Sequence, residues 1–362
     1  RTVYLENMYA YHQFTGGREK MIRWKIKLCL QFFYYVLFSK GNFKLGWIKR
    51  LNIAFNGGFT ANQFYIFNLK ENNKGEYLSE YDWFKSRRLN KPYDYILNDK
   101  FLFNEIAKQY VAVPEIYAVK KYSRIENRLG DNSVEDILDL IKEKKDVMLK
   151  PLSSGKGNGV SHIRFSNEDG MYIDGRFSND GEVISTLTEQ KNWIVTERLK
   201  QADYSKNIYP GCLNTIRILV IKDYESGLFK IINAVHRFGT SATGAVDNAS
   251  RGGIVSQIDI GTGMLTEALS IKNLNIYYFH PDTNVKIKGT SVPDWENIKE
   301  EIIELSERFF YLKMIAWDIA VTSEGLFVIE ANSSSGVNIL QLWEGQRNKE
   351  LGEFLKHHKI IR

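Results

Sequence analysis

The chain has 362 residues, of which 43% are hydrophobic and 25% are charged, so it is long enough for two or three compact lobes and cannot be largely disordered. Its net charge of +6 fits an anionic ligand but is too small to indicate nucleic-acid binding, and we expect no nucleic-acid partner. The two cysteines, Cys29 and Cys212, exclude a disulfide framework and a cysteine zinc site, and they favour a reducing, cytoplasmic compartment.

Residues 1–95 show mostly helical patterns and no catalytic cluster. Within them, residues 28–38 read LCLQFFYYVLF and are flanked by lysines and arginines on both sides. Eleven residues are too few to span a bilayer. The stretch is either a core helix with basic ends or an aromatic, basic helix on an anionic membrane surface, at the inner face of the membrane. We favour the core helix, because burial is the commoner use of such runs.

From about residue 97 the pattern changes to short strands among helices. Asn98 or Asp99 can cap a helix over residues 101–110, and a second capped helix is expected over 133–144. Strands are expected over 116–119, 147–150, 193–197, 215–221, 229–236 and 254–260, with a helix over 295–311 before a final hairpin. This order predicts an α+β fold with many antiparallel strands rather than a doubly wound sheet. We place a domain boundary at residue 95, between a mainly helical region and residues 96–362.

The final hairpin carries two carboxylates and an amide. Its strands, 315–322 and 326–332, are separated by a three-residue turn whose last residue, Gly325, suits a left-handed conformation. In the expected register Thr322 faces Leu326, so Asp318 lies opposite Glu330, and Asn332 shares their face. Facing carboxylates in an apolar sheet need a cation between them, and oxygen ligands favour Mg²⁺ shared with phosphates. The alternative is a solvated polar face on an edge hairpin.

Two further segments are candidates for nucleotide binding. Lys150 ends a strand just before a loop in which Gly155, Gly157 and Gly159 alternate, which lets backbone N–H groups approach phosphate oxygens. Alone this loop would be an ordinary turn, but with Lys150 and the hairpin it predicts a lid over a triphosphate. The strand 193–197 ends in Glu197 and could be a hinge that reads an adenine edge, or an ordinary strand before a charged loop.

Three arginines lie between this hinge and the final hairpin. Arg217 alternates onto the same strand face as Thr215, Arg237 ends the next strand, and Arg251 precedes two glycines that expose backbone donors. An arginine within a β-run needs an anionic partner. Together the three predict a pocket for a γ-phosphate and a substrate carboxylate.

Taken in order, these segments resemble the ATP-grasp superfamily, and more specifically its sugar-transfer-associated branch from polysaccharide loci, from about Leu97 to the end of the chain. The resemblance implies an ATP-grasp fold in which two α+β lobes clasp ATP, a nucleotide lid lobe over 96–200 and a metal and substrate lobe over 201–362. It implies Arg217 and Lys150 as catalytic residues, and either Asp203 or Asn207 could hold the ribose. The implied nucleotide-binding residues are Lys100, Lys150, Ser154, Gly155, Lys156, Gly157, Gly159, Glu197, Leu199, Asn214 and Arg217. The implied substrate-binding residues are Arg237, Asn248, Arg251, Gly252 and Gly253, and the implied Mg²⁺ ligands are Asp318, Glu330 and Asn332.

The resemblance also implies a reaction. ATP-grasp ligases typically phosphorylate a carboxylate and let an amine attack the acyl phosphate, and the polysaccharide association suggests a sugar uronic acid as the carboxylate. Charge neutralisation and positioning then replace covalent catalysis, which agrees with the lack of a Ser/His/Asp or Cys/His constellation. The expected partners are ATP, Mg²⁺, an acidic sugar or other carboxylate, and an amine. Two alternatives stay open: a kinase that phosphorylates a hydroxyl, and a nucleotide- or glycan-binding protein without turnover.

Overall fold

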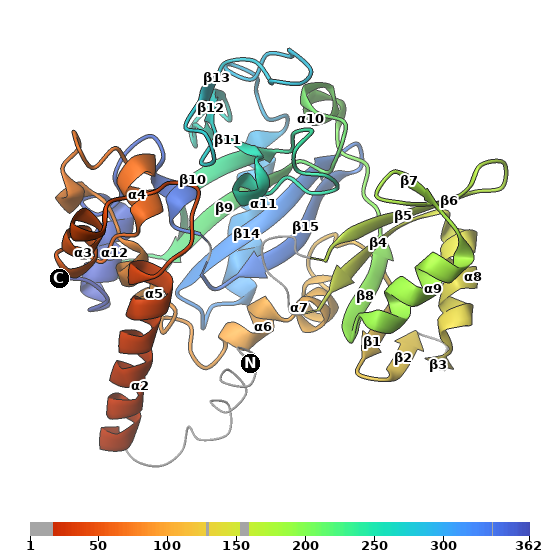
Figure 1. Ribbon diagram of the computed structural model, residues 1–362, viewed down its shortest axis with the longest axis horizontal. Helices are drawn as coiled ribbons and strands as arrows, with labels where there is room; N and C mark the ends of the chain where they lie inside the picture. Colours follow the sequence, from red (N-terminus) through yellow and green to blue (C-terminus); the bar gives the residue numbers. More distant parts are fainter. Residues whose placement is uncertain (1–16, 128–129, 153–158, 335) are drawn as a thin grey trace.

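The computed structural model describes residues 17–127, 130–152, 159–334 and 336–362. Figure 1 shows three parts: a group of N-terminal helices, a large central β-sheet, and a second sheet with helices on its outer side. This arrangement confirms the predicted α+β class with a mainly helical N-terminal region.

The N-terminal part is a set of short helices. They are α2 (Gly17–Gln31), the π-helix η1 (Phe32–Leu37), α3 (Trp47–Phe55), α4 (Ala61–Ile66), the 3₁₀-helix η2 (Lys74–Glu76), α5 (Glu80–Ser86) and α6 (Asp94–Asn98). Helix α4 begins at a capping box, in which the Thr60 side chain accepts from the Gln63 backbone and the Gln63 side chain accepts from the Thr60 backbone. Within the described residues, no helix combines the length and the apolar character that a bilayer crossing requires.

The favoured interpretation of residues 28–38 as a core helix is wrong for most of that stretch. Leu28, Val36 and Leu37 are buried, but Leu30 and Tyr34 are 64% and 69% exposed. Among the described residues, the short helices do not cover one side of α2 and η1, and α2 extends away from the body in Figure 1.

The first sheet has eight strands and lies within residues 116–197. Its order is β3-β2-β1-β8-β4-β5-β6-β7 and every neighbouring pair is antiparallel. Helices α8 and α9 cover one face, and their Ile137, Ile141, Val183 and Leu187 share a core with Trp193 of β8. The elements are β1 (Ile116–Lys121), β2 (Arg124–Asn127), β3 (Gly130–Asn132), α8 (Val134–Lys144), β4 (Asp146–Pro151), β5 (Ser161–Ser166), β6 (Gly170–Ile173), β7 (Arg176–Ser178), α9 (Asp180–Glu189) and β8 (Asn192–Glu197).

The second sheet has seven strands in the order β13-β12-β11-β10-β9-β14-β15, again with antiparallel neighbours. Its elements are α10 (Asp203–Ile208), β9 (Thr215–Lys222), β10 (Phe229–Phe238), η3 (Ala249–Arg251), β11 (Ile254–Ile258), β12 (Leu265–Leu269), β13 (Ile276–Tyr277), α11 (Trp295–Arg308), β14 (Met314–Thr322), β15 (Gly325–Asn332), η4 (Asn338–Gln341) and α12 (Glu350–His357).

Each face of the seven-stranded sheet has its own core. One face packs against α11 and against α7 (Lys100–Ala107), and Trp317 of β14 lies in this core with Phe103 of α7. The opposite face packs against α5, η4 and α12. Trp83 and Leu78 lie in this second core, so residues just before the predicted boundary at 95 pack with the C-terminal lobe rather than apart from it.

Local capping explains where the predicted helices begin. Asp99 is the residue that caps α7, since its carboxylate accepts from the N–H groups of Phe101 and Leu102 at 3.1 and 3.0 Å. Ser133 caps α8 and forms a capping box with Asp136. The aspartate that caps α7 also sets the position of Lys100, the first residue of that helix.

Candidate active site

The hairpin of β14 and β15 brings Asp318 opposite Glu330, as predicted, although the pairing of residues near the turn differs from the predicted one. The structure pairs Thr322 with Gly325 rather than with Leu326, so the expected register at the turn is wrong by one residue. A bulge between the Ile319–Val328 and Asp318–Glu330 pairs then restores the predicted pairing. The bulge also turns Glu330 onto the face opposite Val328, which lies in the core with Trp317.

Arg217 and Asp318 form the centre of the site. They are directly opposite each other on β9 and β14. Arg217 donates from Nε to Oδ1 of Asp318 at 2.7 Å and from Nη2 to Oδ2 at 2.6 Å, which is a bidentate pair. The Arg217 side chain is 11% exposed and that of Asp318 is 2% exposed. A pair this deeply buried fixes the direction of both groups.

Arg237 and Asp247 extend this pair along the sheet. Arg237 of β10 donates from Nη2 to Oδ2 of Asp318 at 3.2 Å and from Nε to the Thr215 hydroxyl at 3.0 Å. Asp247 accepts from the Thr215 backbone N–H at 2.8 Å and lies 3.5 Å from Arg237 Nε. We call Arg217, Arg237, Asp247 and Asp318 the inner network. Asp247 belongs, with Asn248, to the segments that carry the family resemblance, but the sequence assigned it no role.

Electrostatics agree with this alternation of charges. Burial works to raise the pKa of Asp318, but the guanidinium groups of Arg217 and Arg237 outweigh it and hold the pKa at about 2. Burial works to lower the pKa of Arg237, and the carboxylates of Asp247 and Asp318 raise it instead. Burial raises the pKa of Asp247, and the charge of Arg237 opposes that change. The shifts of Asp318 and Arg237 both favour their charged forms.

A second set of side chains lies further from the core. Lys100 Nζ is 3.2 Å from Glu330 Oε2, with side-chain exposures of 20% and 28%. Asn332 donates from its amide to Glu330 Oε1 at 3.4 Å. Asn98 binds Ser333 at 3.2 Å, which ties the start of α7 to the end of β15. With Lys150, these side chains form what we call the outer group: Lys100, Lys150, Glu330 and Asn332.

Lys150 brings the eight-stranded sheet into contact with this group electrostatically. Burial lowers its pKa to about 8, the carboxylates of Glu330 and Glu197 oppose that change, and the positive charge of Lys100 adds to it. The charges of Lys150 and Lys100 therefore interact, although the two residues come from β4 and α7. Predicted phosphate-binding lysines and a predicted metal ligand are together in one place.

The predicted hinge is a short crossing between the sheets. Glu197 ends β8, where its Oε2 accepts from the Glu115 N–H at 3.3 Å. Four residues later, Gln201 forms an isolated antiparallel β-bridge with Thr322 of β14. The N–H group of Ala202 donates to the Val321 carbonyl at 2.9 Å. Leu199 between them is buried. The backbone of this crossing is thus held at both ends.

Asn214 has a scaffold position in the structure. It is 2% exposed, and its amide donates to Gln201 Oε1 at 3.0 Å and to the Tyr209 carbonyl at 2.8 Å. Its Oδ1 accepts from Gly239 N–H at 3.0 Å. Its predicted role in nucleotide binding stays a prediction, and the observed contacts connect the hinge to β9 and β10.

The turn that holds Asn248, Arg251, Gly252 and Gly253 lies next to the inner network. Asn248 caps η3 by accepting from Ser250 N–H at 2.8 Å. Gly252 has a φ of 119°, and a Cβ on Gly253 would lie 2.7 Å from the Asp247 carbonyl oxygen. Both glycines are therefore needed for the path of the chain. Arg251 is half-buried at the end of the turn.

The glycine-rich loop lies largely outside the described residues. This applies to Ser154, Gly155, Lys156 and Gly157, whose predicted roles stay predictions. Gly159 is described, with a φ of 74°, and a Cβ there would lie 2.9 Å from Pro151.

The donor atoms of Asp318, Glu330 and Asn332 are all oxygens, which fits the chemistry of Mg²⁺. No cluster of three His, Cys, Asp or Glu side chains occurs within the described residues, so such a site would rely on two carboxylates and an amide. Three N–H groups of Arg217 and Arg237 already bind Asp318, and a carboxylate has about four lone-pair sites. Glu330 and Asn332 are therefore better placed than Asp318 to hold a metal ion.

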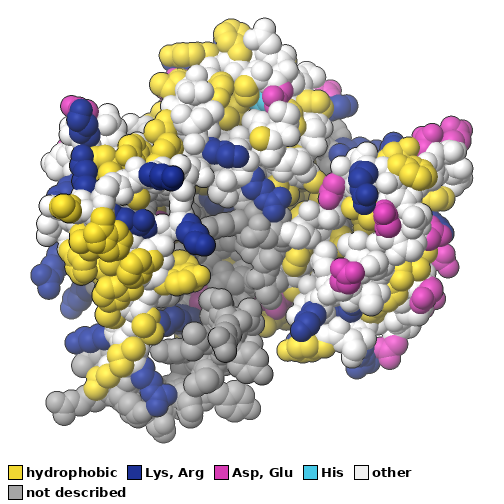
Figure 2. Space-filling model, viewed as in Figure 1, with side chains coloured by type: hydrophobic (Ala, Val, Ile, Leu, Met, Phe, Trp, Pro, Cys, Tyr) yellow, Lys and Arg dark blue, Asp and Glu magenta, His cyan; other side chains and the backbone are white. Residues whose placement is uncertain are grey.

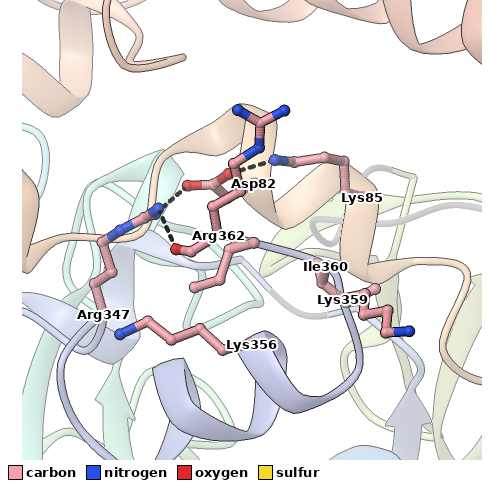
Figure 3. Close-up of a pocket in the computed structure, with 8 residues that line it drawn as sticks. Asp82, Lys85, Arg347, Lys356, Lys359, Ile360 and Arg362 are labelled. Atoms are coloured by element: carbon pink, nitrogen blue, oxygen red, sulfur yellow. Dashed lines mark hydrogen bonds and ion pairs between the residues drawn. The ribbon is translucent and has the colours of Figure 1, made fainter.

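A separate pocket of about 610 Å³ lies at α5 and the C-terminal residues. Figure 3 shows Asp82 between Lys85 and Arg347, each 2.6 Å away. Its basic lining shares no residue with the inner network or the outer group. The carboxylate of Asp82 is already bound by two cations. The inner network and the outer group therefore remain the candidate active site.

Comparisons with solved structures match the chain to a ligase, a synthetase and a synthase. VanG D-Ala:D-Ser ligase from Enterococcus faecalis is 14% identical, with a TM-score of 0.39, and the match covers 68% of this chain and 57% of that one. D-alanyl-alanine synthetase A from Vibrio cholerae is 10% identical, with a TM-score of 0.38 and coverages of 72% and 60%. N5-carboxyaminoimidazole synthase from Aspergillus clavatus is 8% identical, with a TM-score of 0.38 and coverages of 77% and 52%. The chain thus spans little more than half the length of these proteins.

No curated protein matches the chain. The model of the family described as sugar-transfer associated ATP-grasp matches residues 84–353, which is well over half of the chain. The matched range begins within α5 and includes every strand of both sheets. The protein therefore belongs to the sugar-transfer associated ATP-grasp family, and its two antiparallel sheets with their helices form an ATP-grasp fold.

Proposed function

We propose that this protein is an ATP-dependent carboxylate–amine ligase that forms an amide through an acyl phosphate. The observation that carries the proposal is the position of Lys100 and Lys150. They come from different elements, Lys100 lies 3.2 Å from Glu330, and the charges of both Lys100 and Glu330 act on Lys150. Two lysines whose charges interact in this way are stabilised by an anion of high charge, and a nucleoside triphosphate supplies one.

The neighbouring groups fit the rest of this reaction. Glu330 and Asn332, with Asp318 behind them, would hold Mg²⁺, which would neutralise the phosphates as charge moves between them. Arg217 is fixed by its bidentate contact with Asp318, and we assign it to the transferred phosphoryl group. The hinge at Glu197 and Leu199 is assigned to the adenine, because its backbone is held at both ends of the crossing.

The proposed ligase reaction has two steps. The substrate carboxylate attacks the γ-phosphorus of ATP, so that an acyl phosphate forms and ADP leaves. The amine then attacks the acyl carbon, inorganic phosphate leaves, and the amine loses a proton. The residues of the site contribute binding, orientation and charge in both steps, and none of them forms a covalent bond to substrate.

The substrates follow from the family description alone. Its association with sugar transfer supports an acidic sugar, such as a uronic acid of a surface polysaccharide or its precursor, with an amino acid or other amine. We place the reaction in the cytoplasm, since Cys29 and Cys212 are both free thiols.

Release of ADP tests the proposal. Purified protein with ATP and Mg²⁺ is screened with uronic acids and amines, singly and in pairs, and products are weighed by mass spectrometry. We expect ADP release to depend on the acid and to rise when an amine is added, with an amide as product. The matched control is Glu330→Gln, which changes one charge and little volume. ADP release with an acceptor that has a hydroxyl and no carboxylate would instead identify a kinase.

A further inference from the structure

Residues 22–55 present a continuous apolar surface to solvent. Ring contacts connect it: Phe33 lies 6.5 Å from Phe38 between ring centroids, and Phe38 lies 6.0 Å from Trp47. Phe38, Trp47 and Phe55 are all more than half exposed, and Ile48 is 85% exposed. We call Phe33, Phe38, Trp47, Ile48 and Phe55 the apolar patch. Figure 2 shows hydrophobic side chains gathered on this part of the molecule, among lysines and arginines.

Helix α2 continues the patch with a stripe along one face. Ile22, Ile26 and Leu30 are spaced four residues apart, which places them on the same side of the helix, and each is more than half exposed. Leu28 is buried instead. The helix thus has one apolar face in the protein and a second apolar face in solvent, which a soluble surface helix does not need.

The patch is firmly attached to the body of the protein. Val36 and Leu37 of η1 and Ala54 of α3 are buried together with Phe84 of α5. Gln63 of α4 donates to Asn338 Oδ1 of η4 at 3.0 Å. The patch therefore has a fixed direction relative to the seven-stranded sheet.

Charge selects the kind of surface that this patch fits. Residues 22–55 contain seven lysines and arginines and no acidic residue, a net charge of +7, whereas the whole chain has a net charge of +6. The remainder of the protein is therefore slightly acidic, with a net charge of −1. Lys40 and Lys44 are exposed in the connection between η1 and α3, close in sequence to Phe38 and Trp47.

We propose that residues 22–55 dock on the surface of an anionic lipid bilayer. Apolar and aromatic side chains among lysines are the composition of interfacial anchors, in which rings enter the headgroup region and lysines face lipid phosphates. A second copy of the chain fits the patch poorly, because it would bring one +7 surface against another. The inference does not depend on the proposed ligase activity, since it rests on residues outside the candidate active site.

Sedimentation with vesicles tests the proposal. The full chain is mixed with vesicles of phosphatidylcholine and phosphatidylglycerol, or of phosphatidylcholine alone, at low and high salt. We expect the protein to pellet with the mixed vesicles at low salt and to be released as salt is raised, because screening weakens the attraction between lysines and lipid. Equal binding to both kinds of vesicle, or to neither, would overturn the proposal.

Two pairs of variants separate charge from apolar contact. Lys40→Glu/Lys44→Glu should lower the partition coefficient on mixed vesicles by about ten-fold or more. The control Lys121→Glu/Lys191→Glu makes the same charge change at exposed lysines of β1 and of the turn before β8, and should keep most of the binding. Ile48→Glu should also reduce binding about ten-fold, whereas Leu228→Glu, at a site 63% exposed in the turn before β10, should not.

Each variant is checked by its urea unfolding midpoint, and the exposed positions should leave it unchanged. Equal losses in the patch variants and in their controls would overturn the site. Lipid-independent dimerisation that Ile48→Glu abolishes would show instead that a second copy covers the patch.

Discussion

The inner network and the outer group lie next to each other and use the same residue types in different ways. In the inner network, Arg217, Arg237, Asp247 and Asp318 alternate in charge, and each side chain is at most 13% exposed. In the outer group, Lys100 and Glu330 are 20% and 28% exposed, and two lysines are held within electrostatic range of each other. In the inner network, the charged side chains are paired with one another. In the outer group, a bound anion would reduce the repulsion between the two lysines.

This difference separates scaffold from ligand-binding residues. A charge that is buried and paired on several sides cannot turn to a substrate without leaving its partner uncompensated. A charge that is partly exposed can accept a ligand at little cost. Mutations in the inner network should therefore reduce stability, in addition to the effect on turnover that we expect at Arg217, and those in the outer group should act mainly on nucleotide and metal binding.

The largest expected effect is on the stability of Asp318→Asn. The variant leaves Arg217 without its bidentate counter-charge and Arg237 with the carboxylates of Asp247 and Glu330. Breaking a buried ion pair typically costs about 3–5 kcal/mol. Urea unfolding measures the change in the free energy of unfolding. Glu330→Gln is the matched control and should lose less than about 1 kcal/mol. Similar losses in both variants would remove the distinction between the two sets.

The carboxylate of Asp318 should also make the free energy of unfolding fall at low pH, and we call this fall the acid limb. Its folded pKa of about 2 lies below its ordinary value of 3.8, so the unfolded chain takes up the proton first as the pH falls. The stabilisation from Asp318 is therefore complete above about pH 4 and is lost between about pH 4 and pH 2. Asp318→Asn should remove the Asp318 contribution from a plot of unfolding free energy against pH, whereas the part due to other carboxylates with lowered pKa values, such as Asp146 and Asp259, should remain.

Glu330→Gln should lower turnover by about a hundred-fold or more, equal to about 2.7 kcal/mol of transition-state stabilisation. The charge of Glu330 is what Lys100 and a metal ion would share. The ADP-release assay, run in buffer with limiting Mg²⁺, measures the loss. Wild-type turnover in this variant would contradict its place as a metal ligand.

Arg251→Ala and Arg237→Ala test the predicted carboxylate site. Arg251 is half-buried in the turn that follows Asp247, so its variant should keep most of its stability and raise KM for the acidic substrate about ten-fold, equal to about 1.4 kcal/mol. Arg237 contacts Asp318 and Thr215, so its variant should also lose stability. Steady-state kinetics with a parallel unfolding curve distinguish the two. An Arg251→Ala enzyme with unchanged KM would leave the carboxylate to another residue.

How far the sequence could predict this site depends on which contacts are local. The pairing of Asp318 with Glu330 was predictable, because strand alternation and a glycine turn limit the choices. The turn register was not, since nothing in the residues 325–332 marks the bulge that corrects it. Cap residues such as Asp99 and Ser133 were predictable for the same reason: their partners lie two or three residues away.

Contacts between distant strands were harder to predict. The contact of Arg237 with Asp318 was not predicted, because the order β10-β9-β14-β15 cannot be derived from strand patterns; its role in substrate binding stays a prediction. Residues 28–38 were assigned to a core because apolar content alone does not say which faces find a partner. In both cases the missing information is which elements pack together, and local residue patterns do not contain it.

Lys150 gives the smallest but most specific test of the outer group. Because burial lowers its pKa to about 8, the free protein loses this charge as the pH rises from 7 to 9, whereas an ordinary lysine would keep it. ATP has no ionisation left in this range, so its affinity should fall about three- to five-fold, as expected for one lysine–phosphate attraction of about 1 kcal/mol. Isothermal titration of ATP at a series of pH values measures this decline. The Lys150→Met variant should bind ATP more weakly at pH 7, and its ATP affinity should not fall further between pH 7 and pH 9. The Lys156→Met variant should still show the fall in ATP affinity between pH 7 and pH 9. A decline that persists in Lys150→Met would assign the titration to another group, and the two lysines would then not form the phosphate site.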